Sequence, residues 1–175
     1  TSNDLGGYTF NVQAEKAVKV RVLAQVNNAQ YFVDIKDNTQ ADALYALEGT
    51  LVSAGVNATQ TRDLHAPLGW DAGQSRYATE RASAPFAILD ALLDSIDMIV
   101  SAAPQITLPD LTVFWSVNNI ASGGNFAEGQ IGSSLYSTGR GAIYVLGHED
   151  NDTDEFDRAV VQHEFGHYVE DKLSR

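Results

Sequence analysis

The chain has 175 residues, no cysteine and a net charge of −12, and these values exclude several classes of protein. The length suits one ordinary domain, or one small module joined to part of another. The lack of cysteine excludes a disulfide framework and thiolate metal ligands. The negative charge argues against nucleic acid or an anionic membrane as a partner. The chain has no run of about 20 apolar residues, which a membrane-spanning helix would need.

The first third of the chain predicts a β-rich accessory module, residues 1–60. Apolar and polar residues alternate in two stretches, which is typical of half-buried strands. The apolar positions are Val18, Val20, Val22, Ala24 and Val26, then Tyr31, Val33 and Ile35. Asp37-Asn38 predicts a turn. Residues 40–60 allow either another strand or a short helix.

Residues 61–82 predict a connector, because Pro67, Gly69 and Gly73 interrupt any regular pattern there. Two aromatic residues in this segment, Trp70 and Tyr77, leave two interpretations open. They either stack on a ligand or pack against a neighbouring part of the protein.

Residues 83–175 predict alternating helical and extended segments. A helix is expected over 83–100, with Pro85 near its start. Its apolar face contains Phe86, Leu89, Leu93, Ile96 and Val100. A strand is expected over 111–117, apolar at alternate positions, and a second over 141–146. The glycine-rich stretch 122–139 between them predicts a flexible loop.

The most informative motif lies near the C-terminus, where residues 163–167 have the pattern HExxH. On a helix, His163 and His167 are one turn apart on one face, so their rings can bind one zinc ion. Glu164 is then placed to deprotonate a water activated by that metal. His163 and His167 are therefore the candidate metal ligands, and Glu164 is the candidate general base.

The residues around the motif predict a buried helix. Asp152 and Glu155 resemble a capping box at its start. One apolar face is formed by Val161, Phe165, Tyr168 and Val169, and the opposite side carries Phe156 and Val160. A helix that is apolar on both sides is buried, and buried histidines need partners that a metal supplies. The alternative is a surface helix with two solvated histidines.

Residues 157–169 resemble the active-site helix of the zincin metallopeptidases. The order helix, strand, strand, motif helix is similar to the N-terminal half of a thermolysin-like catalytic domain, which implies an α+β fold for 83–175. Metzincins extend the motif with a glycine and a third histidine, where this chain has Glu170 and Leu173. The gluzincin branch, whose third ligand is a downstream glutamate, fits better. Residues 152–175 are also similar to large bacterial secreted proteins, which implies secretion or a cell-surface location.

The resemblance implies zinc-dependent hydrolysis of a peptide or protein substrate. It implies that the strand before the motif helix, including Gly141, Ala142, Ile143 and Tyr144, is an exposed edge that pairs with that substrate. It also implies a third zinc ligand and a second subdomain beyond Arg175. The 175-residue chain alone is then expected to bind zinc weakly and to be inactive.

Two questions stay open from the sequence. His148, Glu149 and Asp150 either form a solvated acidic turn or fold back towards the metal. The function also has alternatives to a peptidase. One is a non-catalytic binding or adhesion module with a structural or degenerate HExxH site, and the other is a different metal-dependent hydrolase.

Overall fold

The computed structural model describes residues 6–57 and 59–174, and its helices and sheets give the α+β content expected from the sequence. The chain divides into two compact units. The first contains the described residues of 6–22 and 47–65, and the second contains 23–46 and 66–174. No helix in the described part of the chain is long and apolar enough to cross a membrane.

A mixed sheet forms the centre of the second unit, with the strand order β11–β12–β10–β4–β3 and with β5 paired to β4. These strands are β3 (Gln25–Asn27), β4 (Phe32–Asp37), β5 (Ala43–Leu44), β10 (Leu111–Trp115), β11 (Leu135–Ser137) and β12 (Ala142–Val145). The three central strands β4, β10 and β12 run parallel, with Val113 between Ile35 and Ile143. β11 pairs antiparallel with β12 and ends the sheet on that side.

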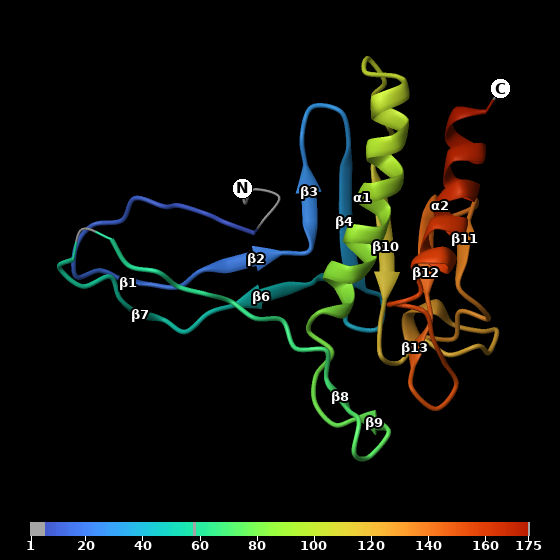
Figure 1. Ribbon diagram of the computed structural model, residues 1–175. Helices are drawn as coiled ribbons and strands as arrows, with labels where there is room; N and C mark the ends of the chain where they lie inside the picture. Colours follow the sequence, from blue (N-terminus) through green and yellow to red (C-terminus); the bar gives the residue numbers. More distant parts are fainter. Residues whose placement is uncertain (1–5, 58, 175) are drawn as a thin grey trace. The chain divides into compact units, whose positions relative to one another are not determined.

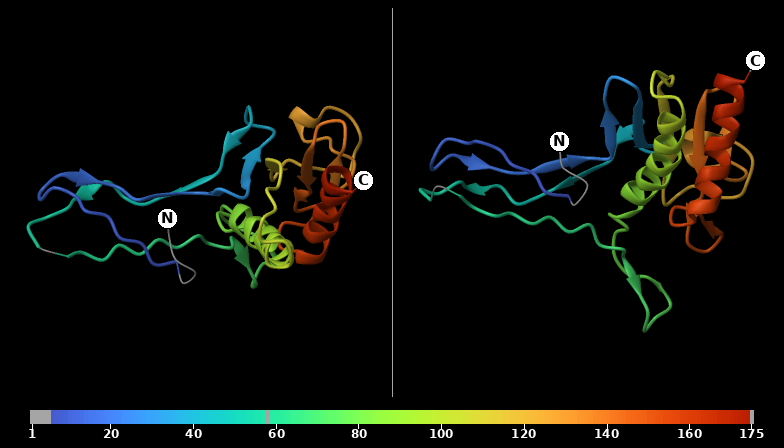
Figure 2. Two further views of the ribbon diagram at one scale, coloured as in Figure 1. Left: turned by 90° about the horizontal axis from the view of Figure 1, so that it is seen from above. Right: turned by 45° about the horizontal axis from the view of Figure 1, so that its top comes forward.

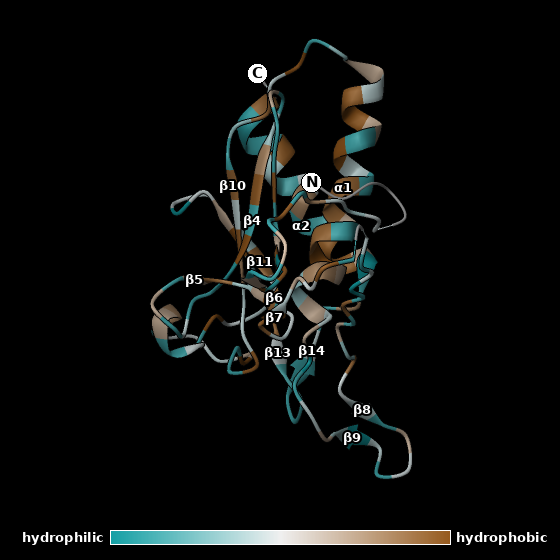
Figure 3. Ribbon diagram, turned by 90° about the vertical axis from the view of Figure 1, so that its left-hand side faces the viewer, coloured by the Kyte–Doolittle hydropathy of each residue, from teal (hydrophilic) through white to brown (hydrophobic). Residues whose placement is uncertain are grey.

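Two helices cover one face of this sheet, α1 (Ala84–Ala102) and α2 (Arg158–Leu173), and they lie side by side (Figures 1 and 2). Both helices mix apolar and hydrophilic residues (Figure 3), as amphipathic helices do. The core between helices and sheet includes Ile88, Leu92 and Ile96 of α1, Val161, Phe165 and Tyr168 of α2, and Val33, Ile35, Val113 and Ile143 of the strands. Burial of each large side chain contributes about 1.5–3 kcal/mol.

A smaller apolar cluster covers part of the opposite face of the sheet. It contains Ile131, Ala142, Tyr144 and Leu146, with Phe114, Phe126 and Leu135 packed against it. Tyr144 stacks on Phe114 with ring centroids 4.9 Å apart, and the Phe126 ring lies 4.6 Å from Tyr144. Phe126 belongs to the 3₁₀ turn η1 (Phe126–Glu128), so the loop after β10 folds back over the sheet.

A buried ion pair joins the segments that lead into the two helices. Arg81 precedes α1 and Glu155 precedes α2, and their side chains are 4% and 0% exposed. The Arg81 guanidinium donates to Glu155 Oε1 and to the carbonyl of Gly147, and it lies over the Tyr77 ring at 4.4 Å. Burial raises the pKa of the Glu155 carboxyl, and the charge of Arg81 opposes that rise. The pair therefore fixes where both helices begin.

Two short hairpins complete the second unit. β8 (Trp70–Asp71) pairs with β9 (Arg76–Tyr77), and β13 (Gly147–His148) pairs with β14 (Asp152–Thr153). Trp70 and Tyr77 face each other across the first hairpin, with ring centroids 5.2 Å apart in an edge-on arrangement. These two aromatic residues therefore pack on each other within the segment expected to be a connector.

The first unit is a set of thin β ladders with little buried apolar surface. β1 (Ala17–Val18) pairs with β7 (Val52–Ser53), and β2 (Arg21–Leu23) pairs with β6 (Ala46–Glu48). Ala54 is the one buried hydrophobic residue among the described residues of this unit. Large apolar side chains on it are exposed: Phe10, Val12, Val22, Leu51, Val52 and Val56.

The predicted boundary at residue 60 is wrong. Residues 23–46 belong to the second unit, because β4 lies between β10 and β3 in the main sheet. The expected strand 18–26 is divided into β1, β2 and β3, and of its five apolar positions Ala24 is the one that is fully buried. The alternation at Val33 and Ile35 predicted β4 correctly, since both side chains are in the core.

The predictions for the remaining segments were closer. α1 matches the helix expected over 83–100 within two residues at its end. β10 has the expected buried alternation at Leu111, Val113 and Trp115, but Val117 lies beyond its end and is exposed. The glycine-rich stretch 122–139 is not only a loop, because it contains η1 and the edge strand β11.

Limited digestion with trypsin tests the division into units. Cleavage is expected first after Lys16, Lys19, Arg21 and Arg62, which belong to the first unit, and much later after Lys36 in the central strand β4. Because β4 is held between two strands, the fragment between the cuts should stay bound to the rest of the chain in native mass spectrometry. Cleavage after Lys36 at the same rate as after Arg62 would contradict this division.

The buried ion pair gives a second prediction. Arg81→Met should lower the free energy of unfolding by about 3–5 kcal/mol, because it leaves the Glu155 carboxyl buried without its partner. Adding Glu155→Leu should restore most of that loss. The matched control is Arg158→Met, because Arg158 pairs with Asp90 and Asp94 at the surface, where about 1 kcal/mol or less is expected. Denaturant unfolding of the four proteins measures this, and equal losses for the two arginines would refute it.

Candidate metal centre

The motif helix begins later than the sequence predicted. α2 starts at Arg158, and the Asp157 carboxylate caps it by accepting from the N–H groups of Ala159 and Val160 at 3.0 and 3.2 Å. The expected capping box is wrong, because Asp152 lies in β14 and Glu155 is the buried partner of Arg81. Asp157 satisfies N–H groups that a helix start otherwise leaves without partners.

One face of α2 is buried, and the histidines lie outside it. Val161, Phe165 and Tyr168 are 1–2% exposed, as the sequence predicted. Both His163 and His167 are exposed. The expectation of a helix buried on both sides is therefore wrong, because Phe156 precedes the helix and is 38% exposed. The two histidines of the motif therefore face an open side of the helix.

The two histidine rings converge at one point. Their Nε2 atoms are 3.2 Å apart, and the ring planes are perpendicular. A tetrahedral zinc ion with Zn–N bonds of 2.0–2.1 Å separates two nitrogen ligands by about 3.3–3.4 Å. The distance between the two Nε2 atoms therefore fits a single zinc ion with little movement of either ring.

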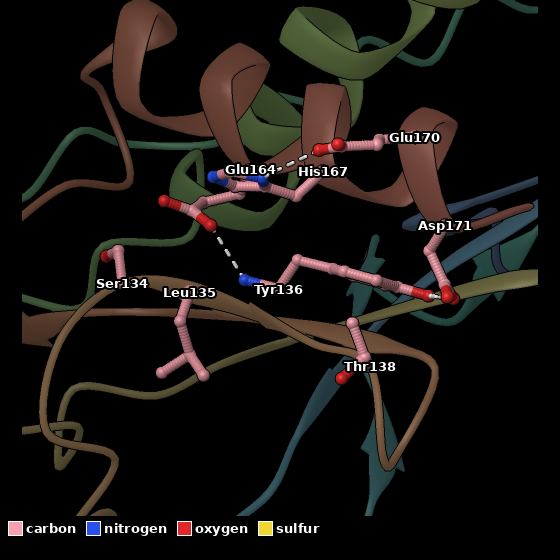
Figure 4. Close-up of a pocket in the computed structure, with 8 residues that line it drawn as sticks. All are labelled: Ser134, Leu135, Tyr136, Thr138, Glu164, His167, Glu170 and Asp171. Carbon is pink, nitrogen blue, oxygen red and sulfur yellow. Dashed lines mark hydrogen bonds and ion pairs between the residues drawn. The ribbon is translucent and has the colours of Figure 1, made fainter. Parts of the chain in front are cut away.

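Glu164 connects the motif helix to the edge strand. The residue is 8% exposed, and its Oε2 accepts a hydrogen bond of 2.7 Å from the main-chain N–H of Tyr136 in β11 (Figure 4). The Tyr136 hydroxyl donates at 2.7 Å to Asp171 Oδ2 one to two turns further along α2. Burial and the bond to Asp171 raise the pKa of Tyr136, whereas bonds from Lys172 and Tyr136 lower the pKa of Asp171.

A second carboxylate lies beside His167. Glu170 Oε2 is 3.8 Å from His167 Nδ1, on the side of the ring opposite Nε2, and Figure 4 draws the two side chains next to each other. Both side chains are at least half exposed. At this distance the two groups are neighbours but are not hydrogen-bonded.

An open pocket of about 530 Å³ lies between β11 and α2. Its lining residues are Ser134, Leu135, Tyr136, Thr138, Glu164, His167, Glu170 and Asp171. The pocket therefore combines the main chain of an edge strand with the acidic and imidazole groups of the motif helix.

A third ligand does not join the two histidines within residues 6–57 and 59–174, where no group of three or more His, Asp or Glu side chains is arranged to hold a metal ion. His148, Glu149 and Asp150 line a different pocket, together with Tyr77, Arg81 and Trp115. Glu149 Oε2 there accepts from the Tyr77 N–H at 3.2 Å. Asp171 is held by Tyr136 and Lys172.

The predicted substrate-pairing edge is wrong. Residues Ala142, Ile143 and Tyr144 lie in β12, which is paired on both sides by β10 and β11, and Gly141 immediately precedes that strand. The edge strand beside the motif helix is β11, which pairs with β12 alone. The sequence analysis missed Tyr136 because β11 has three residues and lies among glycines and serines, so it offers no alternation to detect.

Comparison of the chain with models of known protein families, with curated proteins and with solved structures gave no match.

Proposed function

We propose that this chain carries the zinc-binding helix of a metal-dependent peptide hydrolase. One observation carries the proposal: His163 Nε2 and His167 Nε2 lie 3.2 Å apart, on the same helix as the carboxylate of Glu164. Two imidazoles and an adjacent carboxylate are the groups that hydrolytic zinc sites use. A zinc ion bound there supplies Lewis acidity to a water molecule and to the substrate carbonyl.

The chain's own residues have separate roles in this proposal. His163 and His167 would hold the metal through Nε2. Glu164 takes a proton from the attacking water and passes it to the leaving amine. In the structure its Oε2 accepts from the Tyr136 N–H, so the carboxylate is held at the edge strand.

The edge strand supports a peptide as the substrate. β11 borders the pocket that contains Glu164 and His167, and an extended peptide can add to such an edge through main-chain hydrogen bonds. A catalytic zinc site usually has three protein ligands. We infer that the third ligand comes from outside the described residues. We also propose that the protein is secreted or lies at the cell surface.

A non-catalytic binding module is the second candidate. The observation in its favour is that, within the described part of the chain, only two histidines converge. In such a module, ligands from outside the described residues would fill every remaining coordination position, whereas a hydrolase needs one position open to water. A cobalt-substituted protein distinguishes the two, because added azide changes the visible spectrum only where a position is open.

Zinc affinity tests the metal centre. Titration calorimetry should detect one zinc per chain, with a dissociation constant that rises about a hundred-fold in His163→Ala and in His167→Ala. Structural zinc sites bind the metal with a free energy of about 10–16 kcal/mol, and dividing this among four ligands gives a factor of this size for the loss of one ligand. His65→Ala is the matched control, because His65 is exposed and belongs to the first unit. Equal affinities for all four proteins would refute the site.

The role of Glu164 needs a separate test, in a form of the protein whose zinc site has its third ligand. Glu164→Gln should bind zinc about as tightly as the wild type, while its peptide cleavage falls by about 10²–10⁴-fold, because an amide cannot accept the proton. Glu149→Gln serves as the control, since Glu149 lines the other pocket. Wild-type cleavage by Glu164→Gln would remove this residue from the mechanism.

A further inference from the structure

In the edge strand β11, the main-chain N–H of Tyr136 is bonded to a side chain of the motif helix. In an antiparallel pair, alternate residues point their N–H groups towards the partner strand and away from it. Tyr136 lies opposite Ile143 of β12, yet its N–H donates to Glu164 Oε2 at 2.7 Å. The N–H that a new strand would need at this edge is therefore already used by the motif helix.

Two further contacts hold Tyr136 in place. Its hydroxyl donates to Asp171 Oδ2 at 2.7 Å, and its ring meets the Tyr168 ring edge-on with centroids 6.0 Å apart. The residue is 7% exposed. Because ring and hydroxyl are both fixed against α2, the N–H stays directed at Glu164.

We propose that an extended peptide adding to β11 and the Glu164 carboxylate compete for the Tyr136 N–H, so that strand addition releases Glu164. The catalytic meaning of this exchange rests on the proposed function, because the released carboxylate is the candidate general base. The exchange itself depends only on the hydrogen bond between helix and strand.

The exchange makes Tyr136 a positioning residue. Without a peptide, its N–H keeps Glu164 Oε2 turned towards the strand. With a peptide carbonyl on that N–H, the Glu164 carboxylate loses this donor and becomes free to accept a proton from a water molecule. Peptide binding and activation of the base are then coupled through one N–H.

The pocket also indicates which peptides suit this edge. Besides Glu164, which the peptide displaces, Glu170 and Asp171 line it, and Lys172 pairs with Asp171. Basic side chains in an extended segment therefore meet a favourable charge. A blocked peptide, acetyl-Lys-Thr-Val-Thr-Lys-amide, is a suitable probe because it favours an extended conformation and carries two positive charges.

Amide hydrogen exchange tests the contact without any peptide or metal. In the wild type, the Tyr136 amide should exchange slowly although it lies at the outer side of an edge strand. Glu164→Ala should accelerate its exchange about ten-fold or more, since a charge-assisted hydrogen bond is lost, and Glu164→Gln should give an intermediate rate. Glu170→Ala, in the same pocket but without a contact to Tyr136, should leave the rate unchanged. Equal rates in the wild type and Glu164→Ala would overturn the proposal.

Binding of the blocked peptide then tests the competition. Chemical-shift titration should give an affinity about ten-fold higher for Glu164→Ala than for the wild type, with Tyr136 among the shifted amides. Equal affinities, or no binding to either protein, would overturn the proposal. Failure of the proposed function gives a different result. His163→Ala would then bind zinc as tightly as the wild type, while the Tyr136 exchange rates and the peptide affinities would still change as stated.

Discussion

The packing of one apolar stripe of α2 against the sheet determines where each polar group of the candidate site points. Val161, Phe165 and Tyr168 are buried at successive turns, and the Tyr168 hydroxyl donates to the Pro109 carbonyl at 2.6 Å. Because a helix turns by a fixed angle per residue, this anchoring leaves His163 and His167 together on the open side. Glu164 lies between the two sides, so its carboxylate reaches the edge strand.

The same anchoring makes the site depend on the sheet as much as on the helix. β11 is positioned by its pairing with β12, and it supplies the N–H that holds Glu164. The start of α2 is fixed by Asp157 and by the buried pair of Arg81 and Glu155. A shift of either element would separate Glu164 from its donor before it disturbed the two histidines, whose spacing is local to the helix.

The sequence predicted those features that depend on local periodicity. The apolar face of α2, the helix α1 and the alternation in β4 and β10 all follow from repeated apolar spacing, and the HExxH spacing predicted that His163 and His167 lie together on one side of α2. Features that depend on tertiary pairing were not predictable in this way. The resemblance to zincins implied that the strand at 141–146 is the edge. The three-residue strand β11 pairs outside it, and nothing in the sequence reveals that pairing. Burial of the histidines was wrongly expected because Phe156 was counted as helical.

The central claim is that His163 and His167 bind one zinc ion through their Nε2 atoms. Anomalous diffraction at the zinc edge, from crystals grown with zinc, tests it most directly. Zinc bound by both histidines would give one anomalous-difference peak between the two rings, about 2.0–2.1 Å from each Nε2 atom, with Glu170 facing Nδ1 of His167. A zinc-containing crystal with no peak between the rings, or with the peak among His148, Glu149 and Asp150, would contradict it.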